Sequence, residues 1–219
     1  MAESARRSCY DLLRRWDTTS EHAQDLLATA FAKGKVPASE HALVQNLLFG
    51  VLRHRRVLDL WISHLRKDPL DDHARRAIQL GLYQLFYTRI PDHAAVNETI
   101  GLVKRRISGL VNALLRRAIR ERTKLQALAD EAPPAVRYSV PEFLYDKWLK
   151  QWGEDATEKL CQWNQEPAVN YLRVNRLKPK ADARVREAGL QAMDGERDDF
   201  YLAEPLPREL LEQGYGYIQ

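Results

Sequence analysis

Residues 81–124, GLYQLFYTRIPDHAAVNETIGLVKRRISGLVNALLRRAIRERTK, decide the fold of this chain. Apolar residues recur in this stretch at intervals of three and four, which is the spacing of one face of an α-helix. A helix that begins at Asp92 places four apolar residues on one stripe: Val96, Ile100, Val103 and Ile107. The cations at positions 104–106 would then close its last turn, where positive charge suits the helix dipole.

A second helix is expected directly after the first, and it repeats the same plan. Its apolar side holds Ile107, Leu110, Val111, Leu114, Leu115 and Ala118. Its opposite side holds Arg116, Arg117, Arg120 and Lys124. Two neighbouring helices with basic outer faces favour a protein that contacts the phosphates of RNA.

The composition is that of a folded, helix-rich protein. Of the 219 residues, 45% are hydrophobic, and Gly and Pro number only 10 each. No stretch reaches the ~20 apolar residues of a membrane span, and the first residues lack the apolar core of a signal peptide. A cytoplasmic location without a membrane partner is expected. The two cysteines, Cys9 and Cys161, lie outside any CxxC motif, so no metal site is expected.

The net charge of +4 is divided unevenly along the chain. Residues 1–130 hold 22 Lys and Arg against 14 Asp and Glu, whereas residues 131–219 hold 12 against 16. A basic first part and a mildly acidic second part favour a nucleic-acid binder joined to a segment that packs on another surface.

The pattern of secondary structure divides the chain at about residue 130. Helical periodicity without strand alternation before this point predicts an all-α bundle of about seven helices. Beyond the paired prolines at 133 and 134 we expect two helices and then a strand over residues 169–177. One face of that strand holds Leu172 and Val174, and the other holds Tyr171, Arg173 and Asn175. A helix over 181–188 and a strand over 198–203 complete the expected α+β module.

The candidate binding residues come from the first helix and from the last helix of the bundle. They are Arg6, Arg7, Tyr10 and Arg14, together with Arg116, Arg117 and Arg120. Guanidinium groups donate paired hydrogen bonds to phosphates and stack on unpaired bases, and a tyrosine ring can stack in the same way. The alternatives are a charged face that meets only solvent and a tyrosine that packs at a helix edge.

Two short motifs carry a resemblance to a known family. The pair Asn97-Glu98 on one expected helix is followed by VNALL at 111–115 on the next, as in the NusB-type RNA-binding domain. With GLYQLFYTRIP at 81–91 and NYLRVNRLK at 170–178, the chain resembles the amino-terminal half of the RsmB/Sun family of 16S ribosomal RNA (cytosine-C5) methyltransferases. These enzymes transfer a methyl group from S-adenosylmethionine to carbon 5 of a cytosine.

The resemblance implies a mainly α protein. A NusB-like all-α helical bundle is expected over residues 1–130, followed over residues 131–219 by linker helices and a partial, RRM-like α+β module. The Rossmann-type methyltransferase domain is expected to be absent, because the chain ends about where that domain begins in the family. We therefore assign no catalytic residue and no cofactor to this chain, and S-adenosylmethionine belongs to the full-length enzyme.

The resemblance also bears on binding residues and partners. It implicates Arg6 and Arg7 in contacts with single-stranded RNA, and it makes Arg173 and Asn175 candidates for RNA contact or for packing between domains. Structural roles are expected for Asn97, Glu98 and Asn112. The expected partners are ribosomal RNA and the catalytic methyltransferase domain of the intact enzyme, with a homodimer as a further candidate assembly.

Three functions follow from these observations. The first is an RNA-binding, substrate-positioning region of a ribosomal RNA methyltransferase that is inactive by itself. The second is a stand-alone NusB-like factor that binds RNA in transcription antitermination and so regulates transcription. The third is a protein-interaction bundle, in which the basic faces are incidental and affinity for RNA is weak.

Overall fold

The computed structural model describes residues 4–34, 36–166, 169–193, 199–203 and 207–219. The chain forms two compact units, one ending at Gln165 and the other beginning at Glu166. This division lies later than the predicted boundary at residue 130. The reason is that α9 (Pro134–Arg137) packs on α4 (Arg55–Leu65) and α8 (Arg122–Asp130), so the chain after residue 130 continues the first unit.

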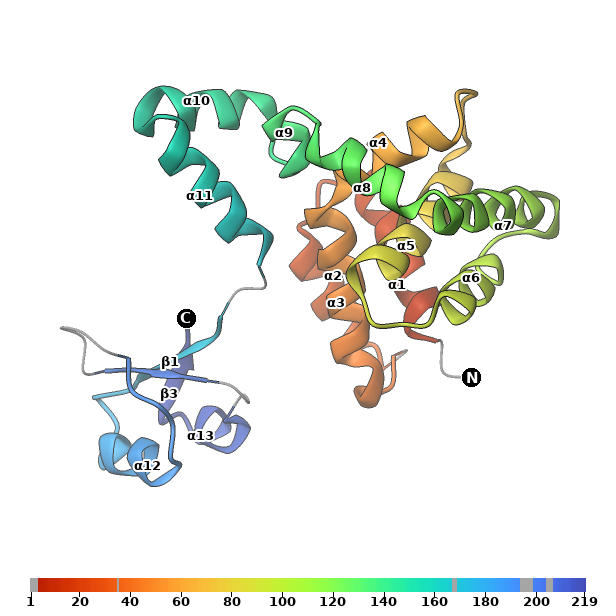
Figure 1. Ribbon diagram of the computed structural model, residues 1–219. Coiled ribbons are helices and arrows are strands. Elements are labelled where there is room, and N and C mark those ends of the chain that lie inside the picture. Colours follow the sequence, from red (N-terminus) through yellow and green to blue (C-terminus); the bar gives the residue numbers. More distant parts are fainter. Residues whose placement is uncertain (1–3, 35, 167–168, 194–198, 204–206) are drawn as a thin grey trace. The chain divides into compact units, whose positions relative to one another are not determined.

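The first unit, here called the helical unit, is built from α-helices and a short 3₁₀ turn, η1 (Ala38–Glu40) (Figure 1). Besides α4, α8 and α9, its helices are α1 (Ala5–Thr18), α2 (Ala23–Ala32), α3 (His41–Arg53), α5 (Asp72–Tyr87), α6 (Asp92–Ile100), α7 (Arg105–Arg120), α10 (Glu142–Trp152) and α11 (Glu154–Gln165). Two of them begin at a capping side chain, because Ser4 accepts a hydrogen bond from the backbone of Arg7 and Asp71 accepts one from Ala74.

The core of the helical unit is built around α5, which contacts α1, α3, α4, α6 and α7. Its small residues permit close approach of the helices. A Cβ atom on Gly81 would lie 2.8 Å from the methyl groups of Leu115 on α7. Gly50 on α3 is more tightly restricted, since a Cβ atom there would lie 1.9 Å from the ring of Tyr83 on α5. Backbone proximity therefore sets the geometry of this core.

The break between α6 and α7 differs from the prediction. The first helix ends at Ile100, followed by Gly101, and Lys104 has extended backbone as the N-cap of α7. The three cations at 104–106 therefore lie at the positive end of the α7 dipole, not at the negative end of α6. Periodicity concealed this break because Ile100 and Ile107, on opposite sides of it, both pack against the same core.

The second unit is a small antiparallel sheet with two helices, and its strand order is β2-β1-β3. Its elements are β1 (Tyr171–Val174), α12 (Ala181–Glu187), β2 (Phe200–Leu202), α13 (Arg208–Glu212) and β3 (Gly216–Ile218). An isolated bridge joins Ala192 to Tyr201 on the outer side of β2. The expected strand, helix and strand are present, whereas α13 was not predicted.

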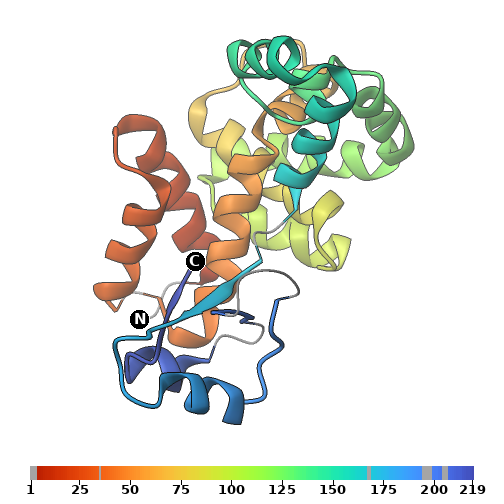
Figure 2. The same ribbon diagram turned by 90° about the vertical axis from the view of Figure 1, so that its left-hand side faces the viewer.

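Both helices of this second unit lie on one side of the sheet (Figures 1 and 2). Leu172 and Val174 of β1 are buried on that side, in one cluster with Val185 of α12 and Leu210 of α13. The predicted alternation along β1 is thus confirmed, as is the fold class of a mainly α bundle followed by a small α+β module. The strands of the described residues pair only in the antiparallel sense, unlike those of a Rossmann-type domain. No helix in the described part of the chain is long and apolar enough to cross a membrane.

Candidate nucleic-acid interface

The first two arginines of α1 donate hydrogen bonds within the helical unit. Arg6 donates from Nε to Oε1 of the buried Gln84 on α5, at 2.7 Å. Arg7 donates from Nη1 to the carbonyl of Leu102 at 2.8 Å and from Nη2 to that of Gly101 at 3.0 Å. Both side chains are half-buried. These predicted RNA-binding residues therefore also hold α1 against α5 and against the loop between α6 and α7.

Tyr10 is enclosed by its neighbours. It is only 2% exposed, and its hydroxyl lies 3.0 Å from Nδ1 of His73. The guanidinium groups of Arg7 and Arg14 lie 5.6 and 5.8 Å from the centre of its ring. Burial raises the pKa of Tyr10, and the charge of Arg14 partly opposes this rise. The ring packs within the helical unit, so the prediction that it stacks on a base does not fit this arrangement.

A basic pocket of about 320 Å³ opens between α1 and the start of α7. Its four cationic lining residues are Arg7 and Arg14 from α1, and Lys104 and Arg106 from the start of α7. Tyr10, His73 and one carboxylate, Asp71, also line it, and Asp71 is engaged as the N-cap of α5. We call this the basic pocket. Lys104 and Arg106 were not predicted as binding residues. The signal for them was Gly101, because glycine commonly ends a helix and so indicates a break before these two cations.

The electrostatics of the basic pocket favour an anion. Lys104 and Arg106 are exposed and lie at the N-terminus of a 16-residue helix, where the dipole already contributes positive potential. A cation in the first turn of a helix is unfavourable by about 0.3–1 kcal/mol, whereas a phosphate at the same place is stabilised by the dipole and by free N–H groups. The arrangement is thus unfavourable without an anion and favourable with one.

The three arginines predicted on α7 separate into two kinds. Arg117 donates from Nη1 to the carbonyl of Leu65 at 2.8 Å and from Nε to Glu121 at 2.7 Å. The hydrogen bond from Arg117 lowers the pKa of Glu121. Arg116 and Arg120 are exposed, and Arg116 bonds only locally to Asn112, at 2.8 Å. Arg117 thus ties α7 to the end of α4, while the other two remain accessible to a ligand.

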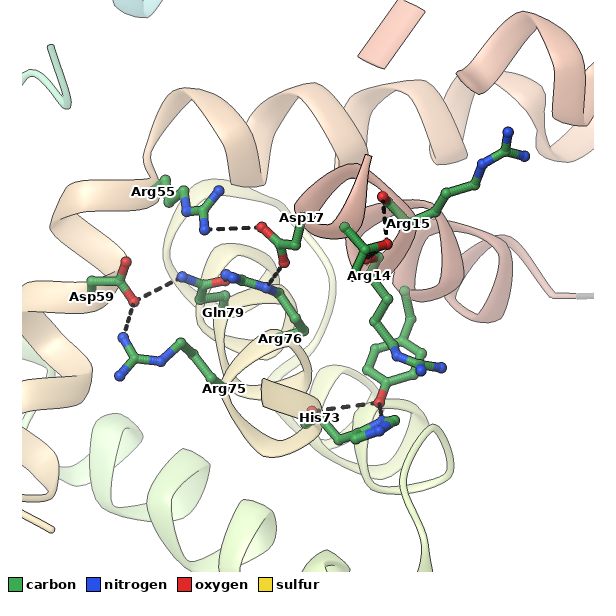
Figure 3. Close-up of polar contacts among 11 residues, drawn as sticks. Arg14, Arg15, Asp17, Arg55, Asp59, His73, Arg75, Arg76 and Gln79 are labelled. Atoms are coloured by element: carbon green, nitrogen blue, oxygen red, sulfur yellow. Dashed lines mark hydrogen bonds and ion pairs between the residues drawn. The ribbon is translucent and has the colours of Figure 1, made fainter. Parts of the chain in front are cut away.

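An open groove of about 810 Å³ beside the basic pocket also contains arginines, but these are neutralised (Figure 3). Asp17 pairs with Arg55 at 3.0 Å and with Arg76, whose side chain is 9% exposed. Burial lowers the pKa of Arg76, and Asp17 opposes the effect. Arg15 likewise pairs with Glu21 at 2.6 Å, so this part of the groove is a structural ion-pair network. Arg14 lines both the groove and the basic pocket and lies 3.9 Å from Asp11.

The two candidates on β1 also differ from each other. Arg173 is exposed on the strand face away from α12 and α13. Asn175 donates from its amide to the carbonyl of Gly214 at 3.0 Å and accepts from the backbone of Leu177 at 3.2 Å. Asn175 therefore fixes the turn that follows β1, and Arg173 alone of the pair is accessible.

The turn between β1 and α12 differs from the S-adenosylmethionine site of a Rossmann-type domain. A site for this cofactor in the Rossmann-type domain is built at a Gly-rich turn that leads from a strand into a helix. Here β1 leads into α12 through residues 175–180, NRLKPK, which contain no glycine. No step that uses this cofactor is assigned to these residues.

The chain matches two protein families. The NusB family matches residues 3–120, and the ferredoxin-like domain of RsmF/B-like methyltransferases matches residues 140–201. The second match agrees with the observed sheet, since β1 lies between β2 and β3 and the bridge at Ala192 adds a fourth antiparallel segment beyond β2. A crystal structure of PH0851 is similar with a TM-score of 0.57 at 15% identity, covering 98% of this chain and 52% of that one. At such low identity this likeness concerns the fold alone.

Curated relatives agree with the family matches. Ribosomal RNA small subunit methyltransferase B of Pseudomonas putida is 40% identical over 182 residues, which cover 78% of this chain and 41% of that protein. The protein of the same name from Klebsiella pneumoniae is 37% identical, covering 81% of this chain and 43% of its own length. A Synechocystis protein named probable ribosomal RNA small subunit methyltransferase B is 32% identical, covering 80% of this chain and 42% of its own length. The chain spans less than half the length of these relatives.

Proposed function

The chain belongs to the NusB family, and we propose that it is the RNA-binding, substrate-positioning region of a ribosomal RNA (cytosine-C5) methyltransferase. The names of its relatives support the substrate class, because they are ribosomal RNA small subunit methyltransferases. In this proposal the chain holds ribosomal RNA, and a catalytic methyltransferase domain of the complete enzyme supplies S-adenosylmethionine and the reaction.

The basic pocket is the observation that carries this proposal. Two segments far apart in the sequence bring Arg7, Arg14, Lys104 and Arg106 to one place, beside a helix N-terminus. Lys104 and Arg106 are exposed there, and such cations beside the N–H groups of a helix N-terminus suit a phosphate of the RNA backbone. Arg116 and Arg120 lie towards the other end of α7, about 15–24 Å along its axis at 1.5 Å per residue. They extend the basic surface along the helix.

The two cysteines support a non-catalytic role for this chain by itself. Methylation at carbon 5 of cytosine requires a thiolate that adds to the ring. Cys9 and Cys161 are both 0% exposed, and burial raises the pKa of each thiol. Neither is therefore suited to attack a base. We further propose that the chain alone does not bind S-adenosylmethionine, and calorimetry that found stoichiometric binding would contradict this.

Fluorescence anisotropy tests the RNA proposal. The purified chain would be titrated into a fragment of small-subunit ribosomal RNA and into an unrelated hairpin, at several salt concentrations. We expect specific binding that the double variant Lys104→Gln/Arg106→Gln weakens about tenfold or more, with a salt slope smaller by about 0.7–0.9 for each phosphate that the variant no longer neutralises. The matched control is Lys147→Gln/Lys150→Gln, which removes two exposed cations from α10.

Other outcomes would favour the rival functions. Equal, weak binding to both RNAs, with no effect of either double variant, would contradict the proposal and favour a protein-interaction bundle. Preference for a leader RNA over ribosomal RNA would favour a NusB-like transcription factor. The ferredoxin-like match at residues 140–201 supports the methyltransferase assignment over that factor, because it lies outside the NusB match.

A further inference from the structure

The sheet of the second unit has one covered face and one open face. Leu172 and Val174 point towards α12 and α13 and are buried, at 0% and 3% exposure. Side chains alternate along a strand, so Tyr171 and Arg173 point to the opposite face. Arg173 is exposed there, and Tyr171 is half-buried.

The strand register brings further side chains to this open face. Arg173 of β1 lies directly opposite Tyr217 of β3 and Phe200 of β2. Directly paired residues on neighbouring antiparallel strands share a face, with Cβ atoms about 4.5–5.5 Å apart. Tyr217 is 53% exposed, which is unusual for a large aromatic side chain. The register thus places Arg173 between Phe200 and Tyr217 on the open face, and Tyr171 lies on the same face two residues earlier in β1.

A run of cations begins on the open face and continues into the turn after β1. Residues 166–219 as a whole hold eight Lys and Arg against ten Asp and Glu. The segment 173–180, RVNRLKPK, nevertheless contains four cations and no carboxylate, and it consists of the end of β1 and the turn that follows. Of these four cations, Arg173 lies on the open face and Arg176 is exposed in the turn after β1, whereas Lys178 donates to the carbonyl of Gln213 and Lys180 is the N-cap of α12.

We propose that Tyr171, Arg173 and Tyr217 form a platform on which unpaired RNA bases stack. Aromatic rings and guanidinium planes on an exposed sheet accept the faces of bases, and neighbouring cations attract the phosphates between them. The proposal rests on the proposed function for the identity of the RNA, but it adds a second surface of different chemistry. The basic pocket holds phosphates and the platform holds bases.

The platform is tested with the full chain and a single-stranded oligoadenylate that carries 2-aminopurine, a base analogue whose fluorescence is quenched on stacking. We expect the chain to quench the probe, and we expect Tyr217→Ala to abolish the quenching and weaken binding by about fivefold or more. Tyr217→Phe keeps the ring and should retain the quenching. Phe143→Ala is the matched control, because Phe143 is an exposed aromatic residue of α10 at 75% exposure.

The guanidinium group has its own matched pair of variants. Arg173→Gln should weaken binding of the probe several-fold. Arg184→Gln should not, because Arg184 lies on α12 and forms an exposed ion pair with Glu187 at 3.3 Å. Unfolding curves of each variant establish that the second unit is folded. Because Tyr217→Phe keeps the aromatic ring, it separates the contribution of the ring to binding from any effect of the substitution on folding.

The two proposals fail in different ways. If Tyr217→Ala quenches the probe as the unchanged chain does, the platform is refuted, whatever the basic pocket does. If Lys104→Gln/Arg106→Gln leaves ribosomal RNA binding unchanged while Tyr217→Ala abolishes the quenching, the stacking platform is supported and RNA binding at the basic pocket is refuted. If Arg173→Gln and Arg184→Gln reduce the quenching equally, the platform is also refuted, because the loss of any positive charge would then have the same effect.

Discussion

The seam between α1 and α5 and the start of α7 both contain clustered cations, yet the surroundings of these cations are opposite. At the seam, Asp17 pairs with Arg55 and Arg76 (Figure 3). At the start of α7, Lys104 and Arg106 are exposed, beside a helix dipole that repels them. Carboxylate partners and burial therefore distinguish a structural cluster of cations from a cluster that is accessible to an anion. The number of arginines does not.

The largest expected effect comes from breaking the seam. Asp17→Asn leaves the buried Arg76 without its ion-pair partner, and removing one member of a buried pair costs about 3–5 kcal/mol of folding free energy. Glu142→Gln is the control, because Glu142 pairs with Arg56 but is 73% exposed, and an exposed pair contributes at most about 1 kcal/mol. Urea denaturation followed by circular dichroism measures both. Equal destabilisation by the two changes would show that the seam is not a buried network.

A buried histidine should make the stability of the helical unit depend on pH. His54, between α3 and α4, stacks on Tyr87 of α5 with ring centres 3.9 Å apart, and burial, aided by the charge of Arg53, lowers its pKa from 6.5 to about 4. The unfolded chain therefore binds a proton in a pH range where the native protein does not. Stability contributed by the neutral histidine is full above about pH 6.5 and is lost as the pH falls towards 4, by about 3 kcal/mol.

Two substitutions isolate this effect. His54→Phe keeps an aromatic ring against Tyr87 and removes the titrating group, so its stability should fall less than that of the unchanged chain between pH 6.5 and 4. His93→Gln, at an exposed position of α6, should leave the pH profile unchanged. Urea denaturation across this pH range provides the comparison. Parallel profiles for the unchanged chain and His54→Phe would refute the assignment.

Neighbouring arginines on α7 should separate stability from binding. Arg117→Gln removes the hydrogen bond to the carbonyl of Leu65 and the ion pair with Glu121, and we expect a destabilisation of about 1–2 kcal/mol. Arg116→Gln should change stability by less than about 0.5 kcal/mol, because its side chain is exposed. Affinity for ribosomal RNA should respond in the opposite sense, with the larger decrease in Arg116→Gln. Thermal unfolding and anisotropy together test this reversal.

The smallest expected effect has the opposite sign. Lys104→Asp places a capping carboxylate at the N-cap of α7, where the present side chain makes no cap hydrogen bond. The new cap and the dipole together should stabilise the helical unit by about 0.5–1 kcal/mol. The same change should weaken RNA binding, since it puts a negative charge in the basic pocket. If Lys104→Asp raises the melting temperature but does not lower the affinity for RNA, RNA does not bind at the basic pocket.

Part of the fold could be predicted because it depends on local pattern. The helical stripes and the alternation along β1 are periodic features of neighbouring residues, and the structure confirms them. The break after Ile100 was missed because the apolar stripe continues across it. The predicted boundary at residue 130 was early for a similar reason, since the packing of α9 on α4 leaves no trace in local sequence.

Composition, charge and motifs are enough to show that the chain is helix-rich, that its basic residues gather in the first part, and that its motifs are those of the NusB family. Which cations are accessible depends instead on the folded structure. Arg7 bonds to a carbonyl 95 residues away and Arg117 to one 52 residues away, while Lys104 and Arg106 stay exposed. The physical reason is that a hydrogen-bond partner is set by packing between distant segments, whereas helical periodicity is set within a few turns of one segment.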